Sequence, residues 1–453
     1  MNRWQVDPRR IRQRLEELAT VGRDPAGGLT RLAFTVEDRQ ARAMVTGYMR
    51  EAGLAVRVDA VGNVFGRKTG LAERTGSPRG SPKGSPKGSV KGSAVGAPVA
   101  AGSHIDTVRN GGRFDGTVGV VCALEVAQVL AETGVEHEIP YEVVVFTDEE
   151  GGRFGSGLLG SRALVGALTG EELRRQKDER GISAWEAMEQ FGLRPADMGT
   201  ARIGKGGFTC FYEVHIEQGS VLETAGCRLG VVEGIVGMIG LTVSITGEAG
   251  HAGATPMRLR RDALAGAGEI ILAVERAAQR IARGGEVSAS AEPTAGEVGS
   301  GAVATVGRIR AWPGASNVIP GRVELTVDLR ARSAAVLDRM VTGVQEEVDA
   351  VCRRRGLGWE IRETMHVPPV DLAVDCVEQI ESICRERGIP YLRMPSGAVH
   401  DAQIMTRITD VGMLFVPSKG GVSHSPLEES AWDDIALAAE VLLQAVCQKI
   451  KCH

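Results

Sequence analysis

Apolar residues recur at helical spacing in two stretches near the start of the chain, residues 11–21 and 35–53. This periodicity predicts two helices. Thr35 is an N-cap signal for the second helix, and Gly53 is a stop signal at its other end. The chain is therefore expected to open with a pair of helices that each bury one face.

The pattern that follows is typical of β-strands. Four segments carry it: AVRVDA, NVFGRK, PVAAGSH and YEVVVFT. The first two alternate between apolar and polar positions, whereas YEVVVFT is apolar on both faces, as in a fully buried strand. A helix is predicted over residues 117–133, between the last two strands. Strands and helices in this order predict an α/β fold with a central mixed or parallel sheet flanked by helices.

The pattern changes after residue 222. Two alternating strands, LTVSITGE and RVELTVDLRA, are separated by a helical stretch over about 258–283. They predict a smaller inserted α/β domain that acts as a lid or dimerisation domain. From residue 334 the chain resumes helix, strand and helix, so the catalytic domain is expected to be discontinuous. The predicted division is a first catalytic segment over 1–222, the lid over 223–333 and a second catalytic segment over 334–453.

A Gly/Ser/Pro/Lys tract over residues 76–98 interrupts the first predicted domain. It cannot bury enough apolar surface to offset the entropy of ordering it. The tract is therefore expected to be a surface loop. A basic tether for an acidic partner is the alternative.

Composition agrees with a large globular protein. The 453 residues exceed one ordinary hydrophobic core, which favours two domains. The net charge of −4 gives no reason to expect a nucleic-acid partner. No apolar run approaches the roughly 18 residues of a membrane span, and the eight cysteines contain no CxxC pair. We expect a cytoplasmic protein with reduced thiols and no membrane partner.

Residues suited to metal binding follow the predicted strands. GSHIDTV places His104 and Asp106 two residues apart, so both side chains can point the same way at the carboxyl end of the sheet. A histidine ligand often donates its other ring N–H to a carboxylate, which suits Asp106. Asp115 follows in the glycine-rich NGGRFDG, where a carboxylate can bridge two cations. Each motif alone is more often structural.

Two adjacent carboxylates, Glu149 and Glu150, follow the apolar strand YEVVVFT. Neighbouring carboxylates repel each other unless a cation or a proton relieves them. We expect Glu150 to be a metal ligand and Glu149 to be the general base that acts on water. A solvated acidic loop is the alternative.

Five of the eight histidines lie in loop-like, glycine-rich or strand-end contexts: His104, His215, His251, His400 and His424. One such histidine is usually an ordinary structural residue. Five of them beside acidic strand ends favour a functional site instead.

The motifs also resemble a known family. GSHIDTVRNGGRFDG, TDEEGGRFG, HIEQG, GHAGATPM, SNVIPG, DLRA and SHSPLE occur in the order found in the dinuclear metal amidases and carbamoylases. These enzymes include N-carbamoyl-L-amino-acid hydrolase, allantoate amidohydrolase and β-ureidopropionase, and they are related to aminoacylase- and carboxypeptidase-type metallopeptidases. The resemblance runs over about 11–443, is strongest to the L-carbamoylases and does not include the 76–98 tract.

The resemblance implies two divalent metal ions per subunit. His104 and His215 would hold one ion, Glu150 and His424 the other, with Asp115 between them. Zinc is the expected metal, although manganese, cobalt or nickel suit the same nitrogen and oxygen ligands. A homodimer is also implied by the resemblance alone.

The family's substrate contacts carry over to Gln218, His251, Asn317, Arg330 and the pocket around His400. Arg330 would form a bidentate pair with a substrate carboxylate, and His251 would stabilise an oxyanion. On the residues alone, Asn317 could simply belong to a turn. Arg330 could equally pair with Asp328 or Asp262.

The expected reaction is metal-dependent hydrolysis of the ureido C–N bond of N-carbamoyl-L-amino acids, which gives amino acid, ammonia and carbon dioxide. The partner is therefore a small ureido substrate with a carboxylate. Allantoate and β-ureidopropionate stay open as substrates, because both need the same catalytic groups. A non-catalytic dimeric binding protein on the same fold is the alternative of another class, and a base at Glu149 argues against it. An aminoacylase or dipeptidase is disfavoured by His215, since those relatives tend to have a carboxylate there.

Overall fold

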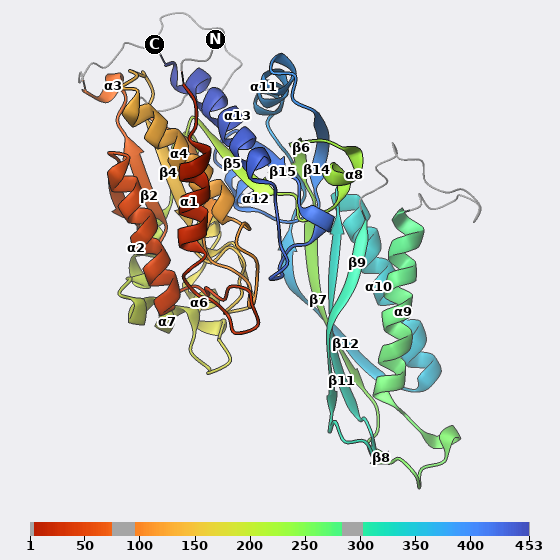
Figure 1. Cartoon of the computed structure of the whole chain (residues 1–453). Coiled ribbons are helices and arrows are strands. Elements are labelled where there is room, and N and C mark those ends of the chain that lie inside the picture. The colour runs from red at the N-terminus through yellow and green to blue at the C-terminus, as the bar shows by residue number, and fades with distance from the viewer. Residues whose placement is uncertain (1–3, 75–95, 283–301, 453) are drawn as a thin grey trace, which may run out of the picture. The chain divides into compact units, whose positions relative to one another are not determined.

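The computed structural model describes residues 4–74, 96–282 and 302–452, which form two compact units (Figure 1). The first unit combines Met1–Glu233, Leu372–Met394 and His400–His453, and the second combines Gly234–Asp371 and Pro395–Val399. The first unit is thus discontinuous in sequence. Residues 76–95 of the predicted Gly/Ser/Pro/Lys loop lie outside the described residues.

A mixed sheet forms the centre of the first unit, with the order β1-β2-β4-β3-β5-β15-β6 and with β14 also paired to β6. Strand β3 runs parallel to both β4 and β5, and β15 runs parallel to β5. Strands β1, β2 and β6 add antiparallel pairs. The strands are β1 (Ala55–Val58), β2 (Val64–Lys68), β3 (Val99–His104), β4 (Tyr141–Phe146), β5 (Cys210–Ile216), β6 (Leu229–Ile235), β14 (Tyr391–Ser396) and β15 (Val411–Val416).

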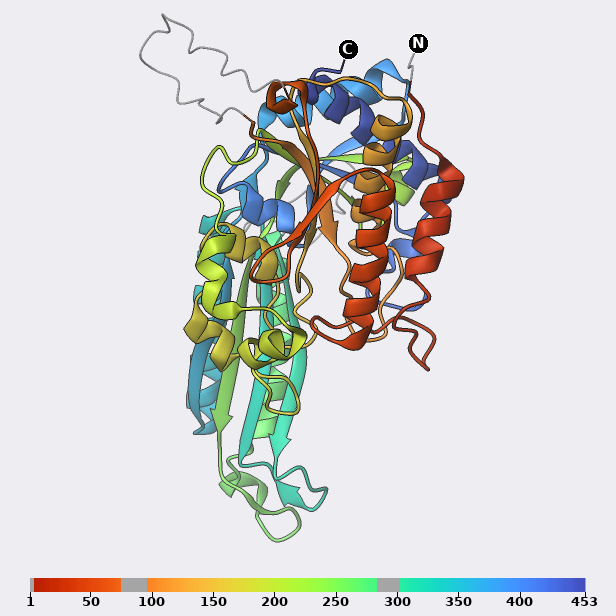
Figure 2. The same cartoon turned by 90° about the vertical axis from the view of Figure 1, so that its left-hand side faces the viewer.

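Helices flank this sheet. Helix α4 is apolar and almost wholly buried, and it contacts β3 as well as α1, α2 and α13 (Figure 2). The main helices of the unit are α1 (Pro8–Leu18), α2 (Val36–Glu51), α4 (Thr117–Glu132), α11 (Val374–Glu386) and α13 (Trp432–Ile450). The shorter ones are α3 (Leu71–Arg74), α5 (Leu159–Leu164), α6 (Gly170–Arg175), α7 (Ala184–Phe191), η1 (Pro195–Ala201), α8 (Val221–Ala225), α12 (Asp401–Met405) and η3 (Lys419–Gly421).

Local signals in the sequence explain where these helices start and stop. The Thr35 hydroxyl accepts the backbone N–H of Asp38 and caps α2. Beyond its other end, Gly53 takes a left-handed φ of 69° that favours glycine. These two signals confirm the prediction made for this helix from the sequence.

The second unit is a four-stranded antiparallel sheet with the order β12-β7-β11-β9, packed against two helices. Its helices are α9 (Ala263–Ala282) and α10 (Ala334–Arg355), with the short η2 (Met257–Leu259). Its strands are β7 (Gly237–Thr246), β9 (Val303–Trp312), β11 (Arg322–Ala331), β12 (Gly358–Val367) and three two-residue strands, β8 (Gly250–His251), β10 (Val318–Ile319) and β13 (Val370–Asp371).

The fold class predicted from the sequence is confirmed, but the compact units begin and end elsewhere than the predicted domains. The predicted lid covers 223–333, whereas the second unit's main segment is Gly234–Asp371. Helix α10 buries Leu337, Met340 and Val344 in the core of the second unit. Strand β12 pairs with β7 along its whole length. Helical periodicity shows that α10 has an apolar face, but it does not show which sheet that face covers. From the sequence, α10 was therefore assigned to the first domain, whereas its apolar face lies in the core of the second unit.

No helix in the described ranges is both long enough and apolar enough to span a membrane.

Candidate metal centre

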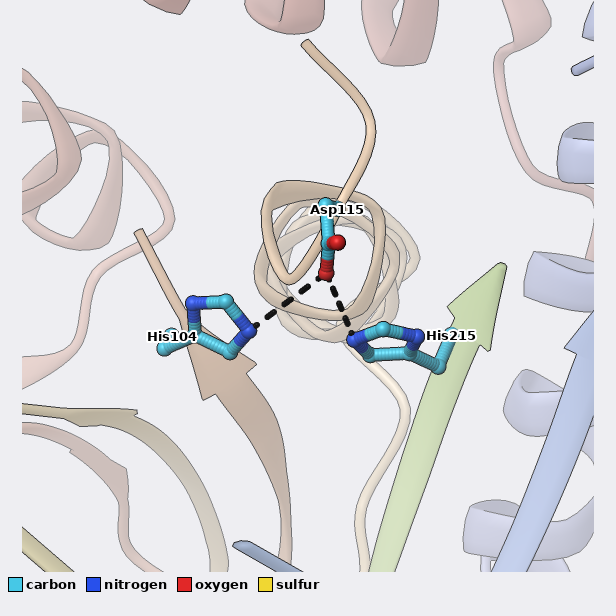
Figure 3. Close-up of side chains that lie close together, drawn as sticks. All are labelled: His104, Asp115 and His215. Carbon is cyan, nitrogen blue, oxygen red and sulfur yellow. Dashed lines mark ion pairs between the residues drawn. The ribbon is translucent and has the colours of Figure 1, made fainter. Parts of the chain in front are cut away.

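Two histidine rings meet at the carboxyl edge of the first unit's sheet. His104 ends β3 and His215 lies near the end of β5, and these strands are parallel neighbours. The Nδ1 atom of His104 lies 3.0 Å from the backbone oxygen of Asp106, and that of His215 lies 2.9 Å from the oxygen of Ile216. A carbonyl oxygen only accepts, so each Nδ1 carries a proton and each Nε2 is left as the candidate ligand atom. Both Nε2 atoms face Asp115 (Figure 3).

Asp115 stands between two groups of nitrogen atoms. Its Oδ1 lies 3.1 Å from His215 Nε2 and 3.7 Å from His104 Nε2. Its Oδ2 lies 3.2 Å from His424 Nε2. Gly116 follows it with a φ of 63°, and a Cβ at this position would collide with the ring of His104. Only glycine therefore lets the Asp115 loop approach β3 this closely before α4 begins.

The second group of ligand atoms comes from loops after β4 and β15. His424 Nε2 lies 3.4 Å from Glu150 Oε2, in addition to its contact with Asp115. Asp115, Glu150 and His424 each offer one ligand atom within 4.8 Å of the others, and so do His104, Asp115 and His215. Asp115 is the member that the two groups share. All five metal ligands predicted from the sequence thus come together around one carboxylate.

Glu149 lies beside these groups without belonging to either. Its Oε2 is 3.6 Å from His104 Nε2, and its side chain is buried. Its backbone N–H and that of Glu150 donate to the two carboxylate oxygens of Asp106, at 3.2 and 3.1 Å. This loop is therefore held by Asp106, with Glu149 beside His104 and Glu150 beside His424.

The position of Asp106 differs from the expectation in one respect. The sequence predicted that its carboxylate would orient His104, but this carboxylate is 3.7 Å from the ring nitrogen. The backbone carbonyl of Asp106 makes the close contact instead. The carboxylate accepts the backbone N–H groups of Glu149 and Glu150.

The electrostatics of the site fit bound cations. His104 Nε2 and Glu150 Oε1 are buried and have no hydrogen-bond partner among the described residues. Burial and then neighbouring carboxylates raise the pKa of Glu149 and of Glu150 well above the usual range. A divalent cation would supply the missing partners and relieve the repulsion between the carboxylates. The nitrogen and oxygen atoms present are those that zinc and similar metals bind.

Asp115 and His215 form a charged pair in the absence of metal. Burial opposes the ionised form of Asp115, but hydrogen bonds from His215 and His424 outweigh it and hold the pKa of Asp115 well below its usual range. Burial likewise lowers the pKa of His215, yet the Asp115 carboxylate raises it to about 9. A metal that takes the Nε2 lone pair must therefore displace a proton from His215.

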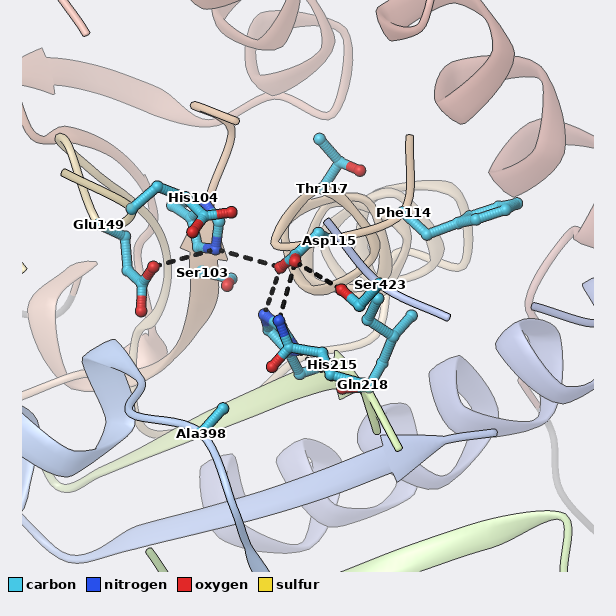
Figure 4. A network of polar contacts seen from close by, with 12 residues as sticks. Ser103, His104, Phe114, Asp115, Thr117, Glu149, His215, Gln218, Ala398 and Ser423 are labelled. Atoms are coloured by element: carbon cyan, nitrogen blue, oxygen red, sulfur yellow. Dashed lines mark hydrogen bonds and ion pairs between the residues drawn. The ribbon is translucent and has the colours of Figure 1, made fainter. Parts of the chain in front are cut away.

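Two of the predicted substrate contacts lie at this centre. Gln218 donates from Nε2 to Asp115 Oδ2 at 2.9 Å, and the same atom is 3.3 Å from His424 Nε2 (Figure 4). Gln218 and His424 both adopt left-handed backbone conformations, with φ of 59° and 53°. Such conformations in residues other than glycine are uncommon and concentrate at functional sites. His400 is buried with its ring centroid 4.5 Å from that of His215.

The other predicted contacts belong to the second unit. His251 in β8 accepts the backbone N–H groups of Gly253 and Ala254 on its Nδ1, at 3.1 Å each, so its proton is on Nε2. Strand β8 pairs with β10, and Asn317, just before β10, accepts the N–H of Ala252 through its backbone oxygen. Arg330 lies in β11, and its side chain pairs with a carboxylate of the protein, which was the alternative to substrate binding.

Arg330 pairs with Asp328 on the same strand. Its Nε donates to Asp328 Oδ1 at 2.9 Å and its Nη2 donates to Oδ2 at 3.1 Å. Its Nη1 donates to the backbone oxygen of Gly397. A cavity of about 550 Å³ in the second unit is lined by Arg330 and Asp328 together with Thr305, Thr326 and Thr364. The guanidinium is thus bidentate toward a carboxylate, and that carboxylate is one of the protein's own.

One residue of the centre was missed from the sequence. Glu428 is buried, accepts backbone N–H groups of the Asp115 loop and contacts Ser423. Burial and then Asp115 raise the pKa of Glu428 to about 7. The motif SHSPLE ends on this residue, and that was the available signal. Periodicity could not reveal that a loop side chain reaches a segment more than 300 residues earlier.

An α/β fold with a mixed sheet, a carboxylate shared by two groups of candidate metal ligands and a further carboxylate beside them are typical of a metal-dependent hydrolase. The chain belongs to the Peptidase family M20/M25/M40, whose model matches residues 100–448. This family is metal-dependent and acts as a hydrolase.

Similar proteins include carbamoyl and ureido hydrolases. The chain is 42% identical to an N-carbamoyl-L-amino acid amidohydrolase of Geobacillus stearothermophilus, with 98% of each chain covered. It is 34% identical to an allantoate amidohydrolase of Bacillus subtilis, with 94% of each covered. A solved amidase of the hydantoinase/carbamoylase family from Burkholderia vietnamiensis matches with a TM-score of 0.83, 33% identity and 98% of each chain covered. These comparisons confirm the family resemblance inferred from the motifs.

Proposed function

We propose that the first unit holds two divalent cations, one on His104 and His215 and one on Glu150 and His424, with Asp115 bridging them. The observation that carries this proposal is the position of Asp115, because its two carboxylate oxygens face different groups of ligand atoms. A carboxylate so placed can ligate two ions at once. Zinc is the proposed metal, and manganese, cobalt and nickel are the alternatives.

The proposed reaction is hydrolysis of the ureido C–N bond of an N-carbamoyl-L-amino acid. Bound cations would polarise the ureido carbonyl and lower the pKa of water toward neutrality. Glu149 takes the proton of the attacking water and passes it to the leaving nitrogen. Its burial among carboxylates raises its affinity for that proton, which suits a group that must hold a proton and then release it. The products are the amino acid, ammonia and carbon dioxide.

Substrate binding is assigned to five polar side chains. We propose that Arg330 binds the substrate carboxylate in place of Asp328, whose contact shows that the guanidinium can hold a carboxylate with two hydrogen bonds. His251 is proposed to donate its Nε2 proton to the developing oxyanion, which its Nδ1 contacts support. Gln218, Asn317 and His400 complete the proposed set.

The choice of substrate rests on the relatives. N-carbamoyl-L-amino acid amidohydrolases at 36–42% identity support the carbamoylase reaction. The allantoate amidohydrolase relative keeps allantoate as the second candidate.

The assembly is proposed to be a homodimer located in the cytoplasm. Strand β9 is at the edge of the second unit's sheet and exposes Val303, Ile309 and Trp312 by 40–54%. An exposed apolar edge strand favours association with another chain. Light scattering of wild-type protein and of Ile309→Lys tests this, with a monomer expected for the variant.

The central test is reconstitution of activity. The protein is stripped with a chelator and reloaded with zinc, manganese or cobalt. Ammonia release is then measured with N-carbamoyl-L-amino acids, allantoate and β-ureidopropionate, and an N-acyl amino acid is the control substrate. We expect metal-dependent ammonia release with highest kcat/KM for an N-carbamoyl-L-amino acid. Preference for allantoate would move the assignment to the second candidate, and no release from any ureido substrate with any metal would refute the proposal.

A further inference from the structure

Glu428 is a buried carboxylate that the proposed reaction does not use. It is 4% exposed and lies in the segment after His424. Its Oε1 accepts the backbone N–H of Phe114 at 2.8 Å and that of Asp115 at 3.1 Å. Its Oε2 accepts the hydroxyl of Ser423 at 3.2 Å. One side chain thus joins the loop that carries Asp115 to the loop that carries His424.

The space for this carboxylate is built into the Asp115 loop. A Cβ at Gly112 would collide with the carboxyl group of Glu428, so only glycine at this position leaves room for it. Burying a carboxylate is costly unless hydrogen bonds satisfy it. Three donors from two loops meet that requirement here, and they do so beside two metal-ligand residues.

Ser423 extends the connection to the bridging ligand itself. Its Oγ lies 3.2 Å from Asp115 Oδ2 as well as 3.2 Å from Glu428 Oε2. The hydroxyl has one proton, so it donates to one carboxylate at a time. When Asp115 Oδ2 ligates a cation, the hydroxyl is free to donate to Glu428 and to keep the His424 loop in place.

The two ligand groups depend on these loops unequally. His104 and His215 are fixed by strands β3 and β5. In the group that they form with Asp115, Asp115 is therefore the one member on a loop that Glu428 contacts. The group of Asp115, Glu150 and His424 has two of its three members on loops that Glu428 joins. His424 is also the most exposed of the five proposed ligands, with 48% of its side chain accessible.

We propose that Glu428 is a positioning residue that selectively sets the affinity of the cation site formed by Asp115, Glu150 and His424. This inference rests on the two-cation part of the proposed function. Residues that orient metal ligands typically change metal affinity by about 10–100-fold when they are replaced. The effect of Glu428 is directed to one of the two cations, because its hydrogen bonds reach Asp115 and, through Ser423, the loop that carries His424.

The test measures metal binding rather than turnover. Full-length metal-free protein is titrated with zinc, and both dissociation constants are obtained by calorimetry together with the zinc content from elemental analysis. Glu428→Ala is compared with Glu428→Gln, whose amide oxygen still accepts the Phe114 and Asp115 N–H groups. Ser423→Ala removes the hydroxyl that joins the two carboxylates. Glu429→Ala is the matched control, since this neighbouring glutamate is exposed and paired with Lys419 at the surface.

We expect Glu428→Ala to weaken one zinc site by about 10–100-fold while the other changes by less than about threefold. Glu428→Gln should restore most of that loss, Ser423→Ala should weaken the same site to a smaller extent, and Glu429→Ala should leave both constants unchanged. Equal weakening of both sites, with a lower melting temperature of the metal-free protein, would show a merely structural role and overturn the proposal. If both zinc dissociation constants of Glu428→Ala equal those of the wild type, the proposal is overturned as well.

The controls separate this inference from the function on which it rests. A wild-type chain that binds a single zinc ion refutes the two-cation part of the proposed function directly. A wild-type chain with two ions and an unaffected Glu428→Ala variant refutes only the role of Glu428. If Glu428→Ala does not fold, Ser423→Ala still decides the matter, because it must weaken one zinc site and leave the other unchanged.

Discussion

The two units hold their polar residues in contrasting ways. In the first unit, His104, Asp115 and Glu149 are buried and crowded, and the Nε2 atom of His104 has no hydrogen-bond partner among the described residues. In the second unit, His251 is exposed and satisfied by two neighbouring N–H groups. Arg330 is likewise satisfied by Asp328.

This difference indicates which groups need something that the protein does not supply. Buried polar atoms without partners cost free energy, so the first unit retains an arrangement that only a ligand can complete. The second unit's residues are stable as they are, and a substrate must compete with their present contacts. Changes to the buried side chains that face the candidate cations are therefore expected to abolish activity, and changes to the substrate contacts of the second unit are expected to adjust it.

The largest expected effect is that of Glu149→Gln. Loss of the general base should lower kcat by about 10²–10⁴-fold, because an amide cannot take the proton of water. The zinc content should stay at the wild-type value, since Glu149 belongs to neither ligand group. Steady-state ammonia release and elemental analysis measure the two quantities. Glu136→Gln, a change at an exposed acid, is the control. A near-normal kcat in Glu149→Gln would assign the base elsewhere.

A smaller effect is expected from Arg330→Ala in the second unit. A hydrogen bond to a charged group contributes about 1.5–3 kcal/mol. The kcat/KM for a carboxylate-bearing substrate should therefore fall by about 10–100-fold, with most of the change in KM. Arg322→Ala is a closely matched control, because Arg322 lies on the same strand and also pairs with an acid two residues away, Glu324. Equal kinetics for the two variants would leave Arg330 as a purely structural partner of Asp328.

The same contrast explains what the sequence could predict. The residues of the first unit lie at strand ends, and the order of strands and glycine-rich turns was enough to bring His104, Asp115 and His215 to one edge. The sequence could not predict individual contacts. Periodicity cannot show that the backbone carbonyl of Asp106 orients the His104 ring, or that Glu428 reaches the Asp115 loop. The second unit extends beyond the predicted lid to Asp371, because the apolar face of α10 packs on its sheet and periodicity does not show which sheet such a face covers.

The stability of the metal-free protein should depend on pH through His215, a proposed metal ligand of the first unit. The pKa of His215 rises from 6.5 to about 9 in the folded chain. The stability that its charged form contributes is therefore fully present below pH 6.5 and is lost as the pH rises through about 9. The raised pKa of Glu149 and of Glu150 acts in the same direction.

The melting temperature of the metal-free protein should thus fall as the pH rises from 6.5 toward 9. His215→Gln should show a shallower fall, because it lacks one of the titrating groups. Scanning calorimetry on both proteins, with chelator present, gives the comparison. A melting temperature that rises over this range would contradict the charged pair of His215 and Asp115.

The smallest effect is expected from Asp106→Asn, and it tests how the first unit orients its ligands. If the carboxylate oriented His104, its loss should weaken zinc binding by about 10–100-fold. The backbone carbonyl of Asp106 makes that contact, however, and the substitution keeps it. The amide side chain introduced by the substitution would also retain one oxygen for the N–H of Glu149 or Glu150. Zinc affinity should therefore fall by less than about tenfold, whereas kcat should fall further, because the loop that carries Glu149 loses one of its two hydrogen bonds. A loss of zinc affinity that exceeds the loss of kcat would return the orienting role to the carboxylate.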